Sequence, residues 1–339
     1  MKNSVLILLA IISYVSQGQT LKNKVEESLI NKVLVDPSPR EIKKVLRGHQ
    51  KLDLSPKDVI IHDSIILPNT NRLYVISHKV ENNTHYGAVI IPIHSNIGKL
   101  PVIIFASGGD GMHIQFDIRQ DFNHKAVQFP NFLGENFDDK YIIVIPSFRG
   151  QQLIIHDKKY QSEGNVGDAF DGATTDAIAF LNTTLKIFDQ VDKNQIAIYG
   201  GSRGGTVALL ASARDKRIKK VIAVACPTDM KALYSLYPDQ FKLLFFNDLL
   251  IGKISESEAR KKFISSSPIY FLKEFPTVQL HHDINDPFVP VDFARRLVDD
   301  MTREGKTIDA YFYEEGIHGF WDDRNYWKRV QEFIRPLLD

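Results

Sequence analysis

Short apolar runs alternate with longer stretches of helical periodicity along most of the chain. The apolar runs cover residues 102–105, 141–145, 195–199, 221–225, 277–280 and 311–313. Because they are continuously apolar, we predict parallel strands that are covered on both faces. The helical stretches cover residues 168–185, 205–214, 291–302 and 322–338. This alternation predicts an α/β fold with a mostly parallel central sheet and helices on both faces.

A different pattern precedes this region. Four β-rich runs, separated by polar Asn and Asp clusters, predict antiparallel strands at the edge of the sheet. These runs are residues 59–61, 65–67, 73–76 and 86–93. Residues 21–52 are instead rich in Lys, Glu and Leu, with a break at Pro37-Ser38-Pro39. We therefore predict a helical lead-in over residues 19–58 and one α/β domain over residues 59–339.

The strand–helix alternation lapses between residues 227 and 275. This segment is too long for a plain loop, so we predict a helical insertion over one end of the sheet. An ordinary crossover with extra helices is the alternative, and both place the segment near the carboxyl ends of the strands, where such folds bind ligands. Its aromatic residues favour an apolar pocket beneath it for acyl or aromatic groups. They are Tyr234, Tyr237, Phe241, Phe245 and Phe246.

Residues 1–18 have the order of a secretory signal peptide. Lys2 precedes an apolar run over residues 5–15, and the small residues Ser16 and Gly18 follow. The run is about half as long as the ~20 residues that a bilayer-spanning helix needs, which argues against a membrane anchor. A buried N-terminal helix is the other alternative. We predict a secreted or periplasmic protein, cleaved after Gly18 and without stable membrane insertion thereafter.

Composition narrows the range of functions. Lys and Arg number 42 and Asp and Glu 41, so the formal net charge is +1 and no basic excess indicates nucleic-acid binding. Cys226 is the only cysteine, which excludes intrachain disulfides and cysteine-rich zinc or iron–sulfur sites. The 43% hydrophobic and 24% charged residues are ordinary for a globular protein. The oligomeric state stays open.

A glycine-rich turn lies between a predicted strand and a predicted helix. It reads Gly200-Gly201-Ser202-Arg203-Gly204-Gly205. Strand, G-x-S-x-G and helix in this order form a nucleophile elbow, a strained turn that exposes the serine hydroxyl. Side chains in place of its glycines would collide with neighbouring backbone. The sequence therefore predicts Ser202 as a nucleophile; a turn without chemistry is the alternative, and a phosphate loop is disfavoured because no Gly-Lys-Ser/Thr ending follows.

A serine nucleophile needs a histidine base, and the histidine needs a carboxylate that fixes its tautomer. In this arrangement the chain order is serine, acid, histidine. Asp283 and Asp286 both follow the predicted strand at 277–280, and we favour Asp286 because it lies deeper in the loop. Asp229 is a third candidate for the acid. His318 follows the last predicted strand, between two glycines, and is the predicted base.

Acyl transfer also needs two hydrogen-bond donors for the tetrahedral oxyanion. The backbone N–H of Arg203 is one candidate. The other is expected in the loop after the first central strand, where Gly108 and Gly109 let backbone N–H groups approach a substrate. A plain turn is the alternative for this loop.

Several other polar residues have simpler interpretations. His281 and His282 are adjacent on a strand and point to opposite faces, so we predict no metal site there and no cofactor. Asp168, Asp171 and Asp176 suit the amino end of a helix and its dipole. Arg149 is expected to brace its loop, and Cys226 is expected to be buried rather than reactive.

These motifs together resemble the catalytic domain of the prolyl oligopeptidase family, which has the α/β-hydrolase fold. Residues 200–205 are similar to its G-G-S-x-G-G, and residues 316–320 to its G-x-H-G-F. Residues 280–290 (LHHDINDPFVP) are similar to its L-x-H-G-x-x-D-x-x-V-P, and this resemblance assigns the acid to Asp286. Phe148-Arg149-Gly150 matches its strand-ending R-G. The resemblance covers residues 85–339 and implies a serine peptidase.

The sequence departs from this family in several places. Arg203 replaces a common aromatic residue, Ser107 replaces the Tyr or His before the glycines, and Asp283 replaces a Gly. Fewer than 90 residues precede the matching region, too few for a β-propeller of four blades at about 40 residues each. Without a propeller, single-domain esterases are equally compatible. We therefore predict a secreted serine hydrolase that cleaves small peptides or esters; an acyltransferase or a non-catalytic binding protein on this scaffold are the alternatives.

Overall fold

The computed structural model describes residues 24–67, 71–93, 98–109, 115–117, 140–155, 158–314, 316–318 and 324–337. The predicted signal peptide lies outside these residues. So do Gly319 and Phe320 of the histidine motif. Within the described ranges, no helix is both long and apolar enough to cross a membrane.

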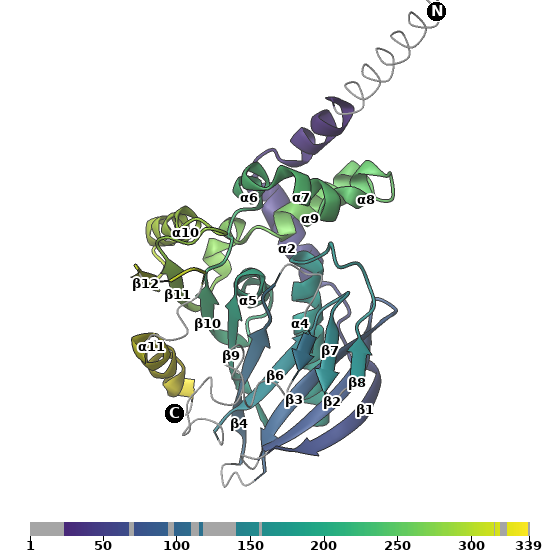
Figure 1. Ribbon diagram of the computed structural model, residues 1–339, viewed down its shortest axis with the longest axis vertical. Coiled ribbons are helices and arrows are strands. Elements are labelled where there is room, and N and C mark those ends of the chain that lie inside the picture. Colours follow the sequence, from purple (N-terminus) through teal and green to yellow (C-terminus); the bar gives the residue numbers. More distant parts are fainter. Residues whose placement is uncertain are drawn as a thin grey trace, which may run out of the picture.

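A large twisted sheet forms the centre of the domain (Figure 1). In the described part of the chain its nine strands lie in the order β1-β2-β3-β6-β4-β9-β10-β11-β12. Their bounds are β1 Lys57–Ile66, β2 Asn71–Val80, β3 Asn83–Pro92, β4 Leu100–Ala106, β6 Ile142–Ser147, β9 Val191–Gly201, β10 Ile218–Val224, β11 Thr277–Asp283 and β12 Ile308–Tyr313. Neighbouring strands from β6 to β12 are parallel, whereas β1, β2, β3 and β6 pair antiparallel. The predicted sheet is confirmed, because all six continuous apolar runs are strands of it.

The edge of the sheet differs from the prediction. Residues 59–61 and 65–67 are not separate strands; both belong to the long edge strand β1 or its end. The polar residues between them do not interrupt β1, because most of this edge strand faces solvent. A second small sheet, which the sequence pattern did not reveal, consists of β5 (Gln115–Asp117), β7 (Gln152–Ile155) and β8 (Lys158–Gln161). Its strands are too short for a recognisable period.

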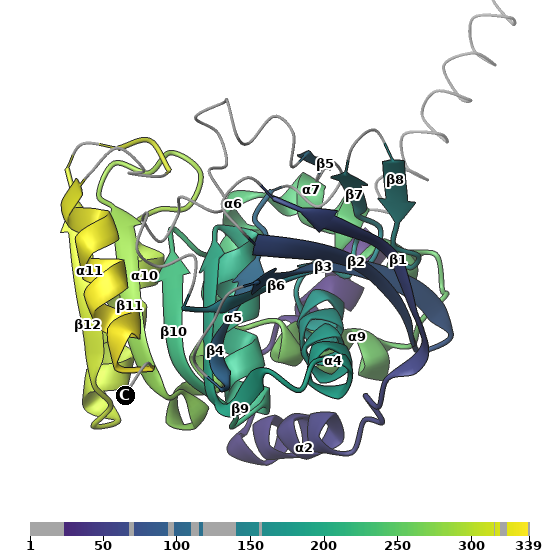
Figure 2. The same cartoon turned by 90° about the horizontal axis from the view of Figure 1, so that it is seen from below.

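Helices cover both faces of the sheet, as predicted (Figure 2). Helices α4 (Asp171–Ile187), α5 (Arg203–Arg214) and α10 (Asp292–Arg303) bury their side chains in one core cluster. Helix α11 (Arg324–Ile334), followed by the short η4 (Arg335–Leu337), contributes to a second cluster. Strand β9 supplies both clusters, because Ile198 faces the first while Ala197 and Tyr199 face the second.

The segment after β10 consists of short helices. They are α6 Met230–Leu236, α7 Pro238–Leu244, α8 Asn247–Leu250, α9 Glu256–Ser265, η2 Pro268–Tyr270 and η3 Leu272–Glu274. The rings of Phe241, Phe245 and Phe246 are buried and pack on one another, with Tyr234 edge-on against Phe241 and Phe246. Phe241, Phe245 and Phe246 therefore do not line a pocket beneath the segment, contrary to the prediction. They belong to the main core cluster, together with side chains of the sheet and of α5, and Tyr234 and Tyr237 pack against it half-buried.

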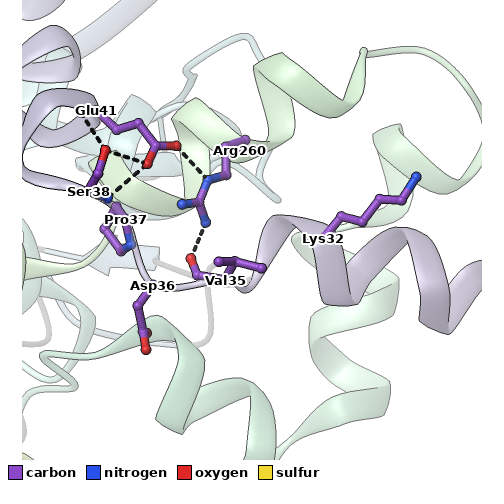
Figure 3. A pocket seen from close by; sticks show the side chains of 7 residues that line it. All are labelled: Lys32, Val35, Asp36, Pro37, Ser38, Glu41 and Arg260. Atoms are coloured by element: carbon purple, nitrogen blue, oxygen red, sulfur yellow. Dashed lines mark hydrogen bonds and ion pairs between the residues drawn. The ribbon is translucent and has the colours of Figure 1, made fainter.

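The N-terminal lead-in docks on this helical segment (Figure 3). A helix over residues 24–33 is followed by α2 (Pro39–Gln50), which Ser38 caps. The guanidinium of Arg260 on α9 donates hydrogen bonds to the carbonyl oxygens of Val33 (2.7 Å) and Val35 and to the carboxylate of Glu41 (3.2 Å). One arginine thus satisfies the end of the first helix and the start of the second. Of the residues that line the groove around it, Ser38, Glu41, Val35 and Arg260 bond to one another, while Lys32 and Asp36 pair with Glu256 and Lys231.

Candidate active site

The predicted nucleophile Ser202 lies at the junction of β9 and α5. Its backbone has φ 53° and ψ −126°, a conformation that residues with a side chain rarely adopt. Its N–H donates a 2.7 Å hydrogen bond to the carbonyl oxygen of Val224, at the end of β10. The sharp turn after β9 therefore has the strained geometry of a nucleophile elbow, and Ser202 is partly exposed.

The glycines around Ser202 are required by close backbone approach. A Cβ atom at Gly200 would lie 2.1 Å from the carbonyl oxygen of Gly204, and one at Gly204 would lie 2.0 Å from that of Ala106. A Cβ at Gly205 would lie 2.6 Å from the Cβ of Cys226. Cys226 is fully buried, and this burial raises the pKa of its thiol to about 12, so it stays protonated at neutral pH.

His318 and Asp286 are joined by a short hydrogen bond. The Nδ1 atom of His318 lies 2.6 Å from Oδ2 of Asp286. Asp286 follows β11 and His318 follows β12, while Ser202 follows β9. Strands β9, β10, β11 and β12 are neighbours and run parallel. The three residues therefore all lie beyond the carboxyl ends of these strands, on the same side of the sheet.

The Asp286 carboxylate is fixed in position by hydrogen bonds. Its Oδ1 atom accepts the backbone N–H groups of Phe288 and Val289, both at 2.9 Å, and its side chain is 0% exposed. A carboxylate can only accept, so His318 donates through Nδ1–H and leaves Nε2 as the acceptor. The imidazole is 22% exposed, and its backbone φ of 97° is another strained value. Nε2 is therefore the ring atom available to take a proton from a partner.

The two rival acids have other roles. Asp283 is buried, and its Oδ1 atom accepts the N–H of Asn285 at 3.1 Å within the turn after β11. Asp229 caps α6 through the N–H of Lys231 (2.8 Å) and forms an ion pair with Arg296. Of the three candidates, the structure brings Asp286 to His318.

The two adjacent histidines of β11 have separate environments. His281 lies 2.8 Å from the Tyr313 hydroxyl and 2.9 Å from the side-chain oxygen of Gln279, and burial lowers its pKa to about 3. His282 donates through Nε2 to the carbonyl oxygen of Val289 at 2.8 Å, and burial lowers its pKa as well. Among the described residues, no group of three or more His, Cys, Asp or Glu could hold a metal ion.

The loop after β4 runs directly against the elbow. A Cβ atom at Gly108 would lie 2.8 Å from the carbonyl oxygen of Gly201 and 3.6 Å from the Cβ of Ser202. Gly109 has φ 97°, which a side chain would disfavour. Arg203 is the first residue of α5, so its N–H lies at the amino end of that helix, directly after the nucleophile. The two predicted sources of oxyanion donors thus flank the serine.

Asp168 and Asp171 lie at the amino end of α4, as predicted, since Asp171 is in its first turn and Asp168 Oδ1 accepts the N–H of Gly172 at 3.1 Å. These acids, and Asp176 further along the helix, also form ion pairs. Arg149 pairs with Asp176 at 2.8 Å and with Asp168 at 3.1 Å. Arg214 pairs with Asp171 at 2.8 Å. The expectation that Arg149 braces its loop is confirmed, because its backbone N–H also donates to Asp176 at 2.8 Å.

Two apolar side chains at the rim of the site were not singled out from the sequence. The ring of Phe288 stands edge-on to the His318 imidazole, with centroids 5.4 Å apart, and Phe288 is 57% exposed. Ile317, beside the histidine, is 77% exposed. The Tyr237 hydroxyl donates to the carbonyl oxygen of Phe288 at 2.7 Å and so ties the helical segment to the acid loop. Their positions next to Asp286 and His318 in the sequence were the available signal.

Comparison with solved structures shows that the fold is shared widely. Acetyl xylan esterase 1 from Thermoanaerobacterium sp. JW/SL YS485 is 16% identical with a TM-score of 0.63, over 91% of this chain and 98% of the esterase. The acetyl xylan esterase of Paenibacillus sp. R4 is 14% identical with a TM-score of 0.60, over 88% and 92%. The uncomplexed acylaminoacyl peptidase of Pyrococcus horikoshii is 18% identical with a TM-score of 0.56, over 79% of this chain and 48% of the peptidase. No curated protein matches the sequence.

The sequence of the domain itself carries a family assignment. Residues 136–336, more than half of the chain, match the prolyl oligopeptidase family. The matched region includes the elbow, the acid loop and His318. The chain therefore belongs to the prolyl oligopeptidase family and is a serine hydrolase of the α/β-hydrolase fold.

Proposed function

We propose that the protein is an exported hydrolase that cleaves small carboxylic esters through an acyl-enzyme on Ser202. The observation that carries this proposal is the 2.6 Å hydrogen bond between His318 and Asp286, which, like the strained turn at Ser202, lies beyond the carboxyl ends of the parallel strands. A serine in a nucleophile elbow and a histidine held by a buried carboxylate have the chemistry of acyl transfer. Small peptides are the second candidate substrate, because the family is named for an oligopeptidase.

The proposed reaction begins with proton transfer from the Ser202 hydroxyl to Nε2 of His318 as the serine oxygen attacks the carbonyl carbon. Asp286 stabilises the imidazolium that forms and keeps its ring oriented. The N–H of Arg203 and a backbone N–H of the Gly108–Gly109 loop stabilise the oxyanion. The imidazolium then protonates the leaving alkoxide, and water repeats the sequence to release the acid and restore Ser202.

Two observations support an ester rather than a peptide as the main substrate. The domain superposes on a solved acetyl xylan esterase with a TM-score of 0.63 and on the acylaminoacyl peptidase with a TM-score of 0.56. Phe288 and Ile317 expose apolar surface beside His318, where a leaving group would depart. We therefore expect aryl and short acyl esters to be hydrolysed at least as fast as aminoacyl anilides. A hydrophobic contact distinguishes one methylene by only about 1–3 kcal/mol, so acyl-length selectivity is gradual.

A matched panel of chromogenic esters and aminoacyl anilides tests this proposal. The wild type should hydrolyse the esters, and a fluorophosphonate probe should block turnover by labelling one site. Ser202→Ala should abolish both labelling and turnover while the protein remains folded. Turnover of anilides alone would support the peptidase instead, and absence of labelling and of turnover in the folded wild type would refute a Ser202 hydrolase.

Export is proposed from the sequence alone. Lys2, the apolar run over residues 5–15 and the small residues that follow have the order of a signal peptide. An exported hydrolase would act on small esters that are present outside the cytoplasm. The test is the mass of the protein recovered from its native host, described with the predictions below.

A further inference from the structure

The side chain of Arg203 reaches across the elbow to the loop after β4. Its Nη2 atom donates a 3.2 Å hydrogen bond to the carbonyl oxygen of Gly108, 95 positions earlier in the chain. Arg203 is only 5% exposed, and its guanidinium lies over the ring of Phe148, 5.4 Å from the ring centroid. A buried cation on an aromatic face has little freedom to choose another position.

A second contact fixes the same loop from the other side. The hydroxyl of Ser107 donates to the side-chain oxygen of Gln151 at 3.4 Å, and that oxygen also accepts the N–H of Phe148 at 3.0 Å. Phe148 is therefore shared: its ring supports Arg203, and its backbone is bonded to the side chain that holds Ser107. The loop is attached to the turn after β6 and to the residue after the nucleophile.

We propose that Arg203 is a positioning residue that orients the Gly108–Gly109 peptide group and thereby the second oxyanion donor. This inference rests on the function proposed above. The backbone N–H of Arg203 belongs to the oxyanion site, and its side chain aligns the other half of that site.

The physical basis is the planarity of the peptide bond. No cis peptide occurs among the described residues, so the N–H of Gly109 points opposite to the carbonyl of Gly108 in one rigid plane. A hydrogen bond from a guanidinium to that carbonyl is charge-assisted and fixes the plane, and with it the direction of the N–H. Glycines have no side chain that could hold this plane by packing, so a loop of two glycines needs an external anchor. Oxyanion stabilisation depends on donors that are oriented before the reaction begins.

The proposal predicts a loss in the chemical step rather than in binding. Arg203→Met keeps the apolar stem of the side chain and removes the donor. For an oxoester it should lower kcat by about 10- to 100-fold, less than the ~10²–10³ lost with a whole oxyanion donor, and leave KM nearly unchanged. The matching thionoester carries C=S, whose sulfur accepts hydrogen bonds poorly, so its kcat should change little. In Arg203→Met, the ratio of oxoester kcat to thionoester kcat should therefore fall toward one.

Arg214 provides a matched control on the same helix. Its guanidinium is also buried and is bound to Asp171 at 2.8 Å, away from the glycine loop. Arg214→Met should change oxoester and thionoester turnover by the same factor, because any effect it has passes through stability. If Arg203→Met does not fold, Arg203→Leu decides by the same ratio, since it also removes the donor and keeps an apolar stem over Phe148.

The outcomes separate this inference from the function on which it rests. A wild type that hydrolyses the oxoester faster than the thionoester, with the ratio reduced only by the Arg203 variants, supports the proposal. A folded Arg203→Met or Arg203→Leu enzyme with the wild-type ratio overturns it and leaves the serine hydrolase intact. A wild type without ester turnover or fluorophosphonate labelling overturns both.

Discussion

Replacing Asp286 by asparagine changes one atom and reverses the hydrogen bonding of His318. The carboxylate accepts from Nδ1 of His318 at 2.6 Å and from the N–H groups of Phe288 and Val289 at 2.9 Å. An asparagine would keep its oxygen toward the two backbone donors and turn its NH₂ group toward the imidazole. Nδ1 must then accept, so the proton moves to Nε2, and this nitrogen no longer takes a proton from Ser202.

Asp286→Asn should lower the activity greatly and the stability only slightly. The loss of the correct tautomer costs on the order of 10⁴ in kcat in a serine triad. Two of the three hydrogen bonds survive and the third becomes neutral, so the free energy of unfolding should fall by about 1–2 kcal/mol. A domain with a stability of about 5–15 kcal/mol stays folded after such a loss.

Asp283→Asn is the matched control for this variant. Asp283 is a buried carboxylate three positions away that accepts an N–H of its own turn. Steady-state hydrolysis of an aryl ester and thermal unfolding should be measured for both variants. Asp286→Asn should lose nearly all kcat at a similar melting temperature, and Asp283→Asn should keep most of it. A near wild-type rate for Asp286→Asn, with loss in Asp283→Asn, would show that the acid is assigned to the wrong residue.

Three further outcomes are expected. The free energy of unfolding should fall as the pH drops below about 6.5, because burial lowers the pKa of His281 to about 3 and the unfolded chain then binds a proton that the folded chain excludes. His281 contributes up to about 2 kcal/mol of this loss at pH 5. Burial lowers the pKa of His49 and His78 as well, so His281→Gln should make the urea-unfolding profile between pH 7 and 5 less steep rather than flat. Gly204→Ala should remove most activity and lower the melting temperature, since its Cβ would lie 2.0 Å from a carbonyl oxygen, whereas Gly98→Ala, with nothing within 4 Å, should change neither. Protein from the native host should begin near Gln19, and an intact mass that retains residue 1 would exclude cleavage.

The sequence was most informative where local physics and the fold agree. The continuous apolar runs of β4, β6, β9, β10 and β11 are buried on both faces, so their pattern identifies them without knowledge of their partners. Strand β12 at the edge of the sheet departs from the predicted burial on both faces, because Phe312 is 38% exposed. Ser202 was predictable because a strained turn between a strand and a helix requires glycines on both sides. The sequence pattern predicts two short strands where the structure has the single strand β1. Polar residues do not end this strand, because most of it faces solvent at the edge of the sheet.

The pattern of residues along the chain does not predict contacts between distant segments. The aromatic rings of Phe241, Phe245 and Phe246 suggest a pocket in the sequence, and only their mutual packing shows that they form a core. The side chain of Arg203 reaches Gly108 across 95 positions, and no local preference encodes that bond. In the sequence, Asp286 is favoured over Asp283 by its depth in the loop and by the resemblance to the family motif. In the structure, the two candidates are distinguished by the hydrogen bond of Asp286 to His318.

The relative positions of the three candidate catalytic residues depend mainly on backbone. Three backbone N–H groups donate to backbone carbonyl oxygens of the neighbouring strand. The N–H of Ser202 donates to the carbonyl of Val224 at 2.7 Å, that of Ala225 to the carbonyl of His281 at 2.8 Å, and that of Ile284 to the carbonyl of Tyr313 at 2.8 Å. These three bonds extend the sheet beyond its strands and link the elbow after β9 to the acid loop after β11 and the end of β12. Backbone bonds of this kind tolerate most side chains, which explains how esterases and peptidases only 14–18% identical to this chain share the fold. Substrate choice must then reside in side chains that project over this frame, and Phe288 and Ile317 are the described apolar ones beside His318.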